Sequence, residues 1–209
     1  MKIVISAGPT RERIDAVRFL SNRSSGKMGF ALAGAAVEAG FDTVLVAGPV
    51  HLETPAGVRR IDVESAAEMA TAVKREAADA DIVIMAAAVA DYRPKQQLSG
   101  KMKKKDGNLT LELERTEDIL KSLGETKRPG QILIGFAAET ENLEQYALDK
   151  LKRKNLDWIA ANDVSRSDIG FGSDANAVTL YGRSGEKIAL PIASKAEIAA
   201  ALLKTCSAR

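Results

Sequence analysis

The stretch DIVIMAAAVA, residues 81–90, is apolar without interruption after its first residue. A continuous apolar run, rather than an alternation of apolar and polar residues, is typical of a strand that is covered on both faces of a parallel sheet. We therefore predict a buried strand over residues 81–90. Its small residues 86–88 leave room for a flat ring. Asp91 follows at the carboxyl end of the strand, where open α/β sheets bind ligands.

Other apolar runs of strand length occur on both sides of this stretch, and helical patterns lie between them. The predicted strands cover residues 2–6, 43–47, 58–63, 131–136 and 157–161, and the predicted helices cover residues 26–39, 66–80, 116–123, 141–154 and 194–203. Strands that alternate with helices predict an α/β fold, here a Rossmann-like, doubly wound, mostly parallel sheet. Two further strands, 177–181 and 187–190, flank a glycine-containing turn and predict a final hairpin.

Residues 95–114 interrupt this alternation. Five lysines lie between Lys95 and Lys105, and Asp106-Gly107 is a hairpin turn signal that leucines follow at every second position. We predict a β-hairpin flap over about residues 95–114 that protrudes from the sheet. Its lysines form either a solvated arm or a cover over an anionic ligand. Since no repeat and no clear linker occurs, we expect one domain over residues 1–209.

Composition limits the classes of function. Hydrophobic residues make up 45% of the 209 residues, which is typical of a folded globular chain. Lys plus Arg number 30 and Asp plus Glu number 28, and this near balance argues against bulk nucleic-acid binding. One cysteine and one histidine allow neither a disulfide framework nor a histidine-based metal site. The sequence has no apolar run of membrane length and no signal-peptide pattern, so we expect a cytoplasmic protein without membrane partners.

Residues 21–29, SNRSSGKMG, lead directly into the first predicted helix. Ser24, Ser25 and Gly26 would bring unpaired backbone N–H groups and the positive end of the helix dipole together, which suits a phosphate or carboxylate. The alternative is an ordinary helix with Ser24 or Ser25 as N-cap. The preceding residues 11–20 contain three arginines. They form either a solvated loop or short helix, or a segment in which one arginine binds a substrate phosphate.

The starts of two later helices also carry signals. Ser65, with Glu68 three residues later, predicts a capping box, and Thr116 is the predicted N-cap of the next helix. Further along the chain, Lys150 and Lys154 are four residues apart and share one face of a predicted helix.

Several familiar catalytic motifs are absent. A Walker-type phosphate loop requires Gly at position 21 and Ser or Thr at position 28, where this chain has Ser21 and Met28. A dinucleotide fingerprint fails at Thr10, and a catalytic triad cannot be assembled around a single histidine. What remains is a Rossmann-like sheet with donors for anions, several lysines and no evident acid–base pair.

Six short motifs, taken together, resemble one family. They are AGPTRE (7–12), SNRSSGKMG (21–29), AAAVADYR (86–93), KMKK (101–104), GFAAET (135–140) and residues 152–157 followed by AND (161–163). In this order they resemble the phosphopantothenate–cysteine ligases of coenzyme A biosynthesis, in the bacterial, CTP-dependent form, over nearly the whole chain. The resemblance implies a single nucleotide-binding ligase domain. The family often carries a flavin-dependent decarboxylase in front of this domain. Because this sequence starts at the first strand, we expect it to lack that activity.

The resemblance also implies a two-step reaction. The carboxylate of 4′-phosphopantothenate attacks the α-phosphorus of CTP and expels pyrophosphate, and the amine of L-cysteine then attacks the acyl-cytidylate and releases CMP. A carboxylate is already ionised at neutral pH, so positioning and charge stabilisation carry the reaction. Mg²⁺ is expected with the triphosphate, held mainly by phosphates and water, and we assign no protein ligand to it. The family implies a homodimer with the flap near the interface.

The resemblance assigns roles to matched positions. Asn22 would donate a hydrogen bond to the acyl carbonyl oxygen, and Lys101 on the flap would stabilise negative charge in the reaction. Asp91 and Asp118 have alternative roles as turn and cap residues. The implied nucleotide-binding residues are Met85, Ala86, Ala87, Asp91, Lys101, Glu117, Asp118, Ile119, Leu120, Phe136, Lys150 and Lys154. The implied substrate-binding residues are Arg18, Asn22, Ser24, Ser25 and Gly26.

Two other functions stay open. A nicotinamide-dependent oxidoreductase on a Rossmann-like sheet would require the dinucleotide fingerprint that the chain lacks. A non-catalytic nucleotide-binding module would bind CTP without turnover. The preference for CTP over ATP rests on the resemblance alone.

Overall fold

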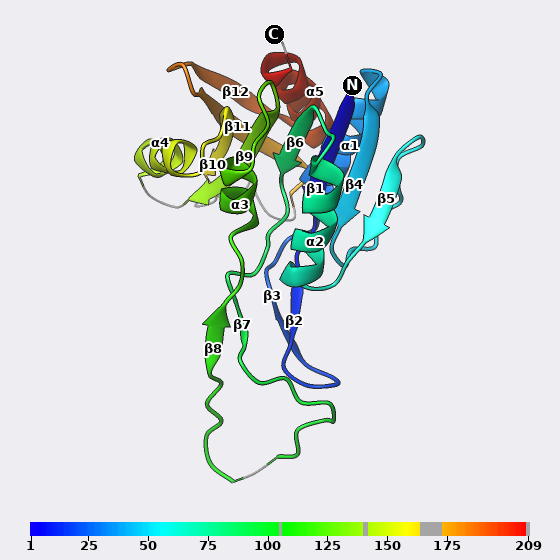
Figure 1. Ribbon diagram of the computed structural model, residues 1–209, viewed down its shortest axis with the longest axis vertical. Coiled ribbons are helices and arrows are strands. Elements are labelled where there is room, and N and C mark those ends of the chain that lie inside the picture. Colours follow the sequence, from blue (N-terminus) through cyan, green and yellow to red (C-terminus); the bar gives the residue numbers. More distant parts are fainter. Residues whose placement is uncertain (105, 140–141, 164–172, 208–209) are drawn as a thin grey trace.

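The computed structural model describes residues 1–104, 106–139, 142–163 and 173–207. Its centre is an eight-stranded sheet (Figure 1). In order across the sheet, the strands are β12 (Lys187–Ser194), β11 (Ala175–Gly182), β10 (Trp158–Asp163), β9 (Ile132–Glu139), β6 (Ile82–Met85), β1 (Lys2–Ala7), β4 (Asp42–Ala47) and β5 (Arg59–Asp62). Lys105, Thr140 and Glu141, which belong to predicted segments, lie outside the described residues.

Six neighbouring strands of this sheet are all parallel to one another: β5, β4, β1, β6, β9 and β10. Numbered by their order along the chain, they run 3-2-1-4-5-6 across the sheet, which is the doubly wound order. The strand order reverses between β1 and β6, and open sheets of this kind bind ligands at that point. Strands β11 and β12 extend the sheet in antiparallel fashion, as the predicted final hairpin. The predicted fold class is confirmed.

Helices cover both faces of the sheet. Helices α1 (Lys27–Glu38) and α5 (Lys195–Cys206) pack on the face that carries Ile3 and Ile5 of β1. Helices α2 (Ala66–Ala77), α3 (Ile119–Glu125) and α4 (Leu143–Arg153) pack on the opposite face, where Val4 lies. The longest of these helices has 12 residues, and no helix of the described ranges is long and apolar enough to cross a membrane.

Helix α1 lies very close to the sheet. A Cβ atom added to Gly29 would lie 2.4 Å from the Cβ of Ala7, so only glycine permits this approach. The close packing brings the first turn of α1 to the carboxyl edge of β1. The N-cap of α1 is Gly26, with φ of 78° and no side-chain cap, so the predicted alternative of Ser24 or Ser25 as N-cap is wrong.

Two other helix starts were predicted. The capping box of Ser65 and Glu68 at α2 is confirmed. The predicted N-cap Thr116 of α3 is wrong, because Asp118 accepts a hydrogen bond from the Lys121 N–H and begins the helix. The hydroxyl of Thr116 instead donates to the carbonyl of Ala90, 2.5 Å away, and cannot serve as a cap.

The predicted strand over residues 81–90 is too long, because β6 ends at Met85. The end of β1 and the loop that follows it accept hydrogen bonds from the next N–H groups. Ala87 donates to the hydroxyl of Ser6 (3.1 Å), Ala88 to the carbonyl of Gly8 (2.9 Å) and Ala90 to the hydroxyl of Thr10 (3.0 Å). These long-range bonds turn the chain away from the ladder, so residues 86–90 form a loop at the sheet edge.

The predicted solvated loop or short helix over residues 11–20 is also wrong. Strands β2 (Arg11–Arg13) and β3 (Phe19–Ser21) form an antiparallel hairpin. Asp15 closes its turn, since its carboxylate accepts hydrogen bonds from the N–H groups of Val17 and Arg18, both at 2.8 Å. An Asp that caps its own turn in this way favours a reversal of the chain over a helix.

The predicted flap protrudes from the sheet, as expected (Figure 1). We call residues 92–115 the arm. Strands β7 (Tyr92–Pro94) and β8 (Leu113–Arg115) pair only at its base, so the predicted alternating strand from Leu109 is wrong before Leu113. Leu109 is 60% exposed, because a two-stranded ribbon has no second layer to bury its leucines.

Candidate functional site

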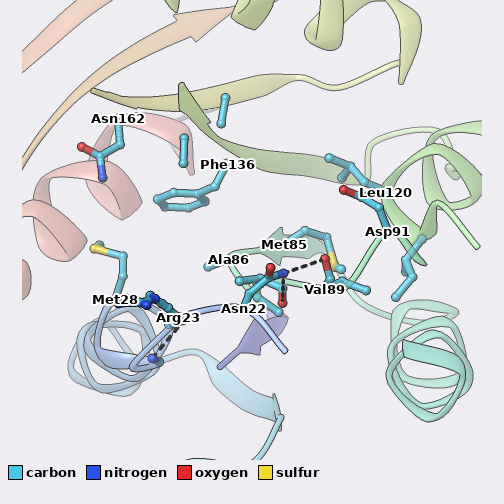
Figure 2. Close-up of a pocket in the computed structure, with 18 of the residues that line it drawn as sticks. Asn22, Arg23, Met28, Met85, Ala86, Val89, Asp91, Leu120, Phe136 and Asn162 are labelled. Carbon is cyan, nitrogen blue, oxygen red and sulfur yellow. Dashed lines mark hydrogen bonds between the residues drawn. The ribbon is translucent and has the colours of Figure 1, made fainter. Parts of the chain in front are cut away.

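A pocket of about 480 Å³ opens where the strand order reverses, at the carboxyl edge of the sheet. A volume of this size suits a small-molecule ligand. The walls come from the loop before α1 and its first turn, from the loop after β6, from the start of α3 and from the end of β9. In Figure 2, Arg23 and Met28 mark the α1 side, Asp91 and Leu120 mark the opposite side, and Phe136 and Ala86 lie between them.

The α1 side offers backbone donors. Ser24, Ser25 and Gly26 line the pocket, as does the first turn of the helix. The Ser24 hydroxyl accepts a hydrogen bond from the Gly26 N–H at 3.3 Å and does not cap the helix. Among the described residues, no side chain caps α1, and the N-terminus of the helix carries the positive end of the helix dipole. This arrangement suits a phosphate or carboxylate.

Asn22 lies where the loop before α1 meets the loop after β6. Its amide nitrogen donates to the carbonyl oxygens of Ala88 (3.0 Å) and Val89 (3.2 Å), which are the dashed contacts drawn from Asn22 in Figure 2. These bonds fix the orientation of the amide and join the two loops. Donation to a substrate oxygen, the role implied by the resemblance, requires the amide to share or release one of these bonds.

The middle of the pocket is an apolar ledge. Met85, Ala86 and Ala87 form one side of it, and the half-buried ring of Phe136 lies opposite Ala86. The side chains of Ile119 and Leu120 extend the apolar surface to the start of α3. A flat, uncharged ring can lie against such a surface without leaving buried polar groups unpaired.

Lys150 of α4 and Lys154, the C-cap of that helix, both reach the pocket, as their predicted shared helix face suggests. Lys150 donates to the carbonyl oxygen of Phe136 at 2.8 Å, and Lys154 forms a 2.8 Å ion pair with Asp118. The Lys154 side chain is only 12% exposed, so it does not belong to a solvated face. Burial opposes ionisation of Asp118, yet the bonds from Lys154 and the Lys121 N–H hold its pKa below the usual value.

Glu117 also lines the pocket but is engaged elsewhere. It forms an ion pair with Lys74, and it accepts a hydrogen bond from Ser122 at 2.6 Å. These bonds hold the pKa of Glu117 below its usual value, so it faces the pocket as a carboxylate. Asp118 is both the cap of α3 and a pocket residue, so its structural role is confirmed without excluding a functional one.

Sequence reasoning missed one end of the pocket. Asn162, Asn176 and Lys195 line it, and they are 9%, 3% and 8% exposed. The amide oxygen of Asn162 has no hydrogen-bond partner among the described residues. Burial and the neighbouring Lys27 lower the pKa of Lys195. The AND motif at 161–163 was the available signal for Asn162. No motif marked Asn176, which lies in β11, or Lys195, which begins α5 directly after β12.

Two residues with implied roles do not line the pocket of this chain. Arg18 is held by Asp15 at the turn of the β2–β3 hairpin, and Lys101 is exposed on the arm. The roles of both residues stay predictions. The remaining implied binding residues all line the pocket, and their roles also stay predictions.

The strand order and the pocket define a Rossmann-like α/β protein with a small-molecule site beside an uncapped helix. Residues 1–208 match the family described as DNA/pantothenate metabolism flavoprotein C-terminal domain, and the chain belongs to this family. The family expected from the sequence motifs is thereby confirmed.

Named relatives agree with this family. The chain is 54% identical over 207 residues to the coenzyme A biosynthesis bifunctional protein CoaBC of Bacillus subtilis (strain 168), covering 99% of this chain and 51% of the relative. It is 50% identical over 204 residues to CoaBC of Vibrio cholerae, covering 97% and 51%. The chain therefore spans about half the length of the curated relatives it matches. A crystal structure of the C-terminal domain of CoaBC is 48% identical with a TM-score of 0.84, covering 98% of this chain and 92% of that one.

Proposed function

We propose that this chain is a phosphopantothenate–cysteine ligase. It joins 4′-phosphopantothenate to L-cysteine through an acyl-cytidylate and converts CTP to CMP and pyrophosphate. The observation that carries the proposal is one pocket with an uncapped helix end on one side, lysines from α4 and an apolar ledge. This set of groups suits a triphosphate and a flat base together. Similarity to relatives named for coenzyme A biosynthesis supports the same pathway.

In the first step, a carboxylate oxygen of 4′-phosphopantothenate bonds to the α-phosphorus, and the bond from that phosphorus to pyrophosphate breaks. Negative charge shifts onto the leaving phosphates. The N-terminal end of α1, where the helix dipole is positive, and the side chain of Lys27, the first residue of that helix, can stabilise that charge. No general base is needed, because the nucleophile is already ionised at neutral pH.

In the second step, the amine of L-cysteine attacks the acyl carbon, and the bond from that carbon to the CMP oxygen breaks. The amine gives up a proton to water or phosphate, and a negative oxygen forms on the acyl carbon before CMP leaves. Asn22, fixed between two loops, supplies a neutral donor to this oxygen. Lys101 supplies positive charge from the arm.

The two sides of the pocket suggest how the nucleotide lies. The triphosphate binds at the α1 side, and the base lies on the ledge at Ala86, Ala87 and Phe136. Lys150 and Lys154 complete the nucleotide site, with Asp118 keeping Lys154 in place. The choice of CTP rests on the family resemblance.

Mg²⁺ would accompany the triphosphate and neutralise part of its charge. Within the described residues, no three His, Cys, Asp or Glu side chains gather to hold a metal ion. This donor set fits an ion that keeps phosphate and water ligands, and we assign no protein ligand to it. The residues of this chain act by binding and orienting the nucleotide.

We also propose a homodimer with the arm near the interface. Large apolar side chains gather on the arm and the β2–β3 hairpin, where the chain alone leaves them exposed. Such surfaces often mark protein–protein contacts. The residues concerned, each at least 43% exposed, are Val17, Phe19, Tyr92, Leu98, Leu109 and Leu113. Sedimentation equilibrium checks the dimer, which a monomer at all concentrations would contradict.

Pyrophosphate release tests the function. We expect rapid release with 4′-phosphopantothenate and CTP, a far lower kcat/KM with ATP, and CMP release that depends on L-cysteine. CTP binding without turnover would favour a non-catalytic module. A kcat/KM with ATP that equals or exceeds that with CTP would contradict the nucleotide choice. Nicotinamide reduction would point to the oxidoreductase alternative.

A further inference from the structure

Arg18 and Lys101, the two functional candidates outside the pocket, belong to segments that meet at one carboxylate. Asp15, in the turn between β2 and β3, has a side chain with no solvent exposure. Its Oδ1 accepts hydrogen bonds from the N–H groups of Val17 and Arg18. Its Oδ2 accepts from Arg18 Nε at 3.0 Å and Nη2 at 2.5 Å, and from the Met102 N–H at 3.1 Å.

Further bonds join the same two segments. Arg18 Nη2 donates to the carbonyl oxygen of Met102 at 3.2 Å, and the Leu98 N–H donates to the carbonyl oxygen of Ile14 at 3.1 Å. Residues 98–102 are thus attached to the β2–β3 hairpin at both ends. The two carboxylate oxygens of Asp15 bind different segments. Oδ1 closes the turn, and Oδ2 holds the arm.

Lys101 directly precedes Met102, so the bonds made by the Met102 backbone also hold the backbone of Lys101. Its side chain is exposed and forms no ion pair with a described residue. The last backbone bond at the base of the arm is that from Lys95 to Glu112, six residues away along the chain. Without the contacts to Asp15 and Arg18, the segment that carries Lys101 would be attached only through Leu98.

We propose that Asp15 is a positioning residue, which holds the backbone beside Lys101 through the Met102 N–H and so fixes where that lysine can act. The function of Lys101 rests on the proposed ligase, but the attachment itself does not. A fixed lysine has lost its conformational freedom before the reaction, which is how positioning raises a rate. The five bonds that Asp15 accepts keep its carboxylate ionised, with a pKa well below the usual range.

Asp15→Asn separates turn closure from attachment of the arm. The amide keeps one oxygen for the N–H groups of Val17 and Arg18, but its NH₂ group cannot accept from Met102 or Arg18. If Asp15 only closes the turn, this variant resembles the wild type. Met102→Pro is a second variant that removes the N–H donor from the arm and leaves the Asp15–Arg18 pair intact.

The first test is tryptic cleavage of the full chain after Lys103 and Lys104; cleavage after Lys101 is not used, because trypsin does not cut before the proline of Met102→Pro. We expect Asp15→Asn and Met102→Pro to speed this cleavage about 10-fold or more, because the segment opens more often. Arg13→Gln is the matched control on β2, where Arg13 forms an exposed ion pair with Glu64, and it should leave the cleavage rate unchanged. Unchanged cleavage in both variants overturns the proposal, whether or not the chain is a ligase.

The second test is a kinetic cycle with Lys101→Ala. We expect Asp15→Asn to lower kcat about 10-fold or more and to leave the KM for CTP within about twofold, because the pocket contains no residue of the attached segment. In the Lys101→Ala background, Asp15→Asn should cause no further loss, because it acts through that lysine. An equal additional loss in the double variant overturns the positioning role. A wild-type chain without ligase activity would refute the proposed function and leave the cleavage test valid.

Discussion

The pocket and the arm are built by different means. The pocket walls are attached to parallel strands that helices cover on both faces, so their positions follow from the sheet. The arm has a ladder of three residue pairs at its base, exposed leucines beyond it and a few hydrogen bonds to the β2–β3 hairpin. Binding groups thus lie on the rigid part of the molecule, and the lysine implied in the chemistry lies on the part with the least support.

This difference has a consequence for variants. Changes to the nucleotide-binding groups of the pocket should alter how tightly the nucleotide binds, since these groups are already in place. Asn22, which lines the pocket and is proposed to act in the second step, is the exception. Changes in the arm should alter the rate more than the binding, because the pocket is complete without the arm residues that surround Lys101. The following predictions are ways to test this division.

A large effect on kcat is expected at the arm. Lys101→Ala should lower kcat about 10²–10³-fold, because a positive group facing the developing charge is lost. The dissociation constant of CTP should change far less. Steady-state kinetics and calorimetry measure the two quantities, and Lys104→Ala, another exposed lysine of the arm, is the control. Equal losses in kcat and in CTP affinity would contradict the claim that the arm affects the rate and the pocket affects binding.

The sheet and its covering helices, which carry the pocket, should lose stability in acid. Glu76 is 7% exposed, and its hydrogen bond with Arg59 leads the interactions, with Arg75 and Lys2, that lower its pKa to about 2 from 4.5. This stabilisation is present above the unfolded pKa and is lost as pH falls towards 2. From the shift, we expect Glu76→Gln to lower the free energy of unfolding by up to about 3 kcal/mol at pH 7, and by roughly half of that at pH 3.

Urea unfolding at the two pH values measures this difference. Because Glu76 lies in α2 and not on the arm, tryptic cleavage of the arm should not change in Glu76→Gln at pH 7. A stability difference that is the same at both pH values would show that the charge of Glu76 does not matter.

The smallest effect is expected at Lys150 and Lys154. Lys154→Met or Lys150→Met should weaken CTP binding by about 1–3 kcal/mol, because each lysine is partly shielded from water at the nucleotide site. Lys152→Met changes an exposed lysine of the same helix and is the matched control. Calorimetry measures the affinities, and thermal unfolding should change little in all three variants. Wild-type affinity in both pocket variants would remove them from the nucleotide site.

Sequence reasoning located most strands and helices because apolar runs and periodicity are local signals. It failed where distant groups decide the conformation. Residues 86–90 leave the sheet because Ser6, Gly8 and Thr10 take up their N–H groups, and no pattern within DIVIMAAAVA could reveal that. The β2–β3 hairpin was missed because its turn depends on one Asp side chain.

The candidate site, like the fold, could be predicted only in part from the sequence. The motifs identified the α1 side and the ledge, because these lie beside the parallel strands, where a doubly wound sheet binds ligands. Asn176 and Lys195 were missed, because the antiparallel strands that bring them to the pocket are not part of that pattern. The sequence could not show that Arg18 and Lys101 lie together outside the pocket, since 82 residues separate them and one buried carboxylate joins their segments.

The most direct test of the two-step ligation uses Asn22→Asp, which is nearly isosteric but replaces the amide donor with a carboxylate. Mass spectrometry after mixing the variant with CTP and 4′-phosphopantothenate, then with L-cysteine, measures the acyl-cytidylate. We predict that the intermediate and pyrophosphate form, and that transfer to cysteine is about 10²–10³-fold slower than in the wild type, so the intermediate accumulates. A variant that folds normally, accumulates no intermediate and turns over near the wild-type rate would contradict the role of Asn22 and the two-step ligation built on it.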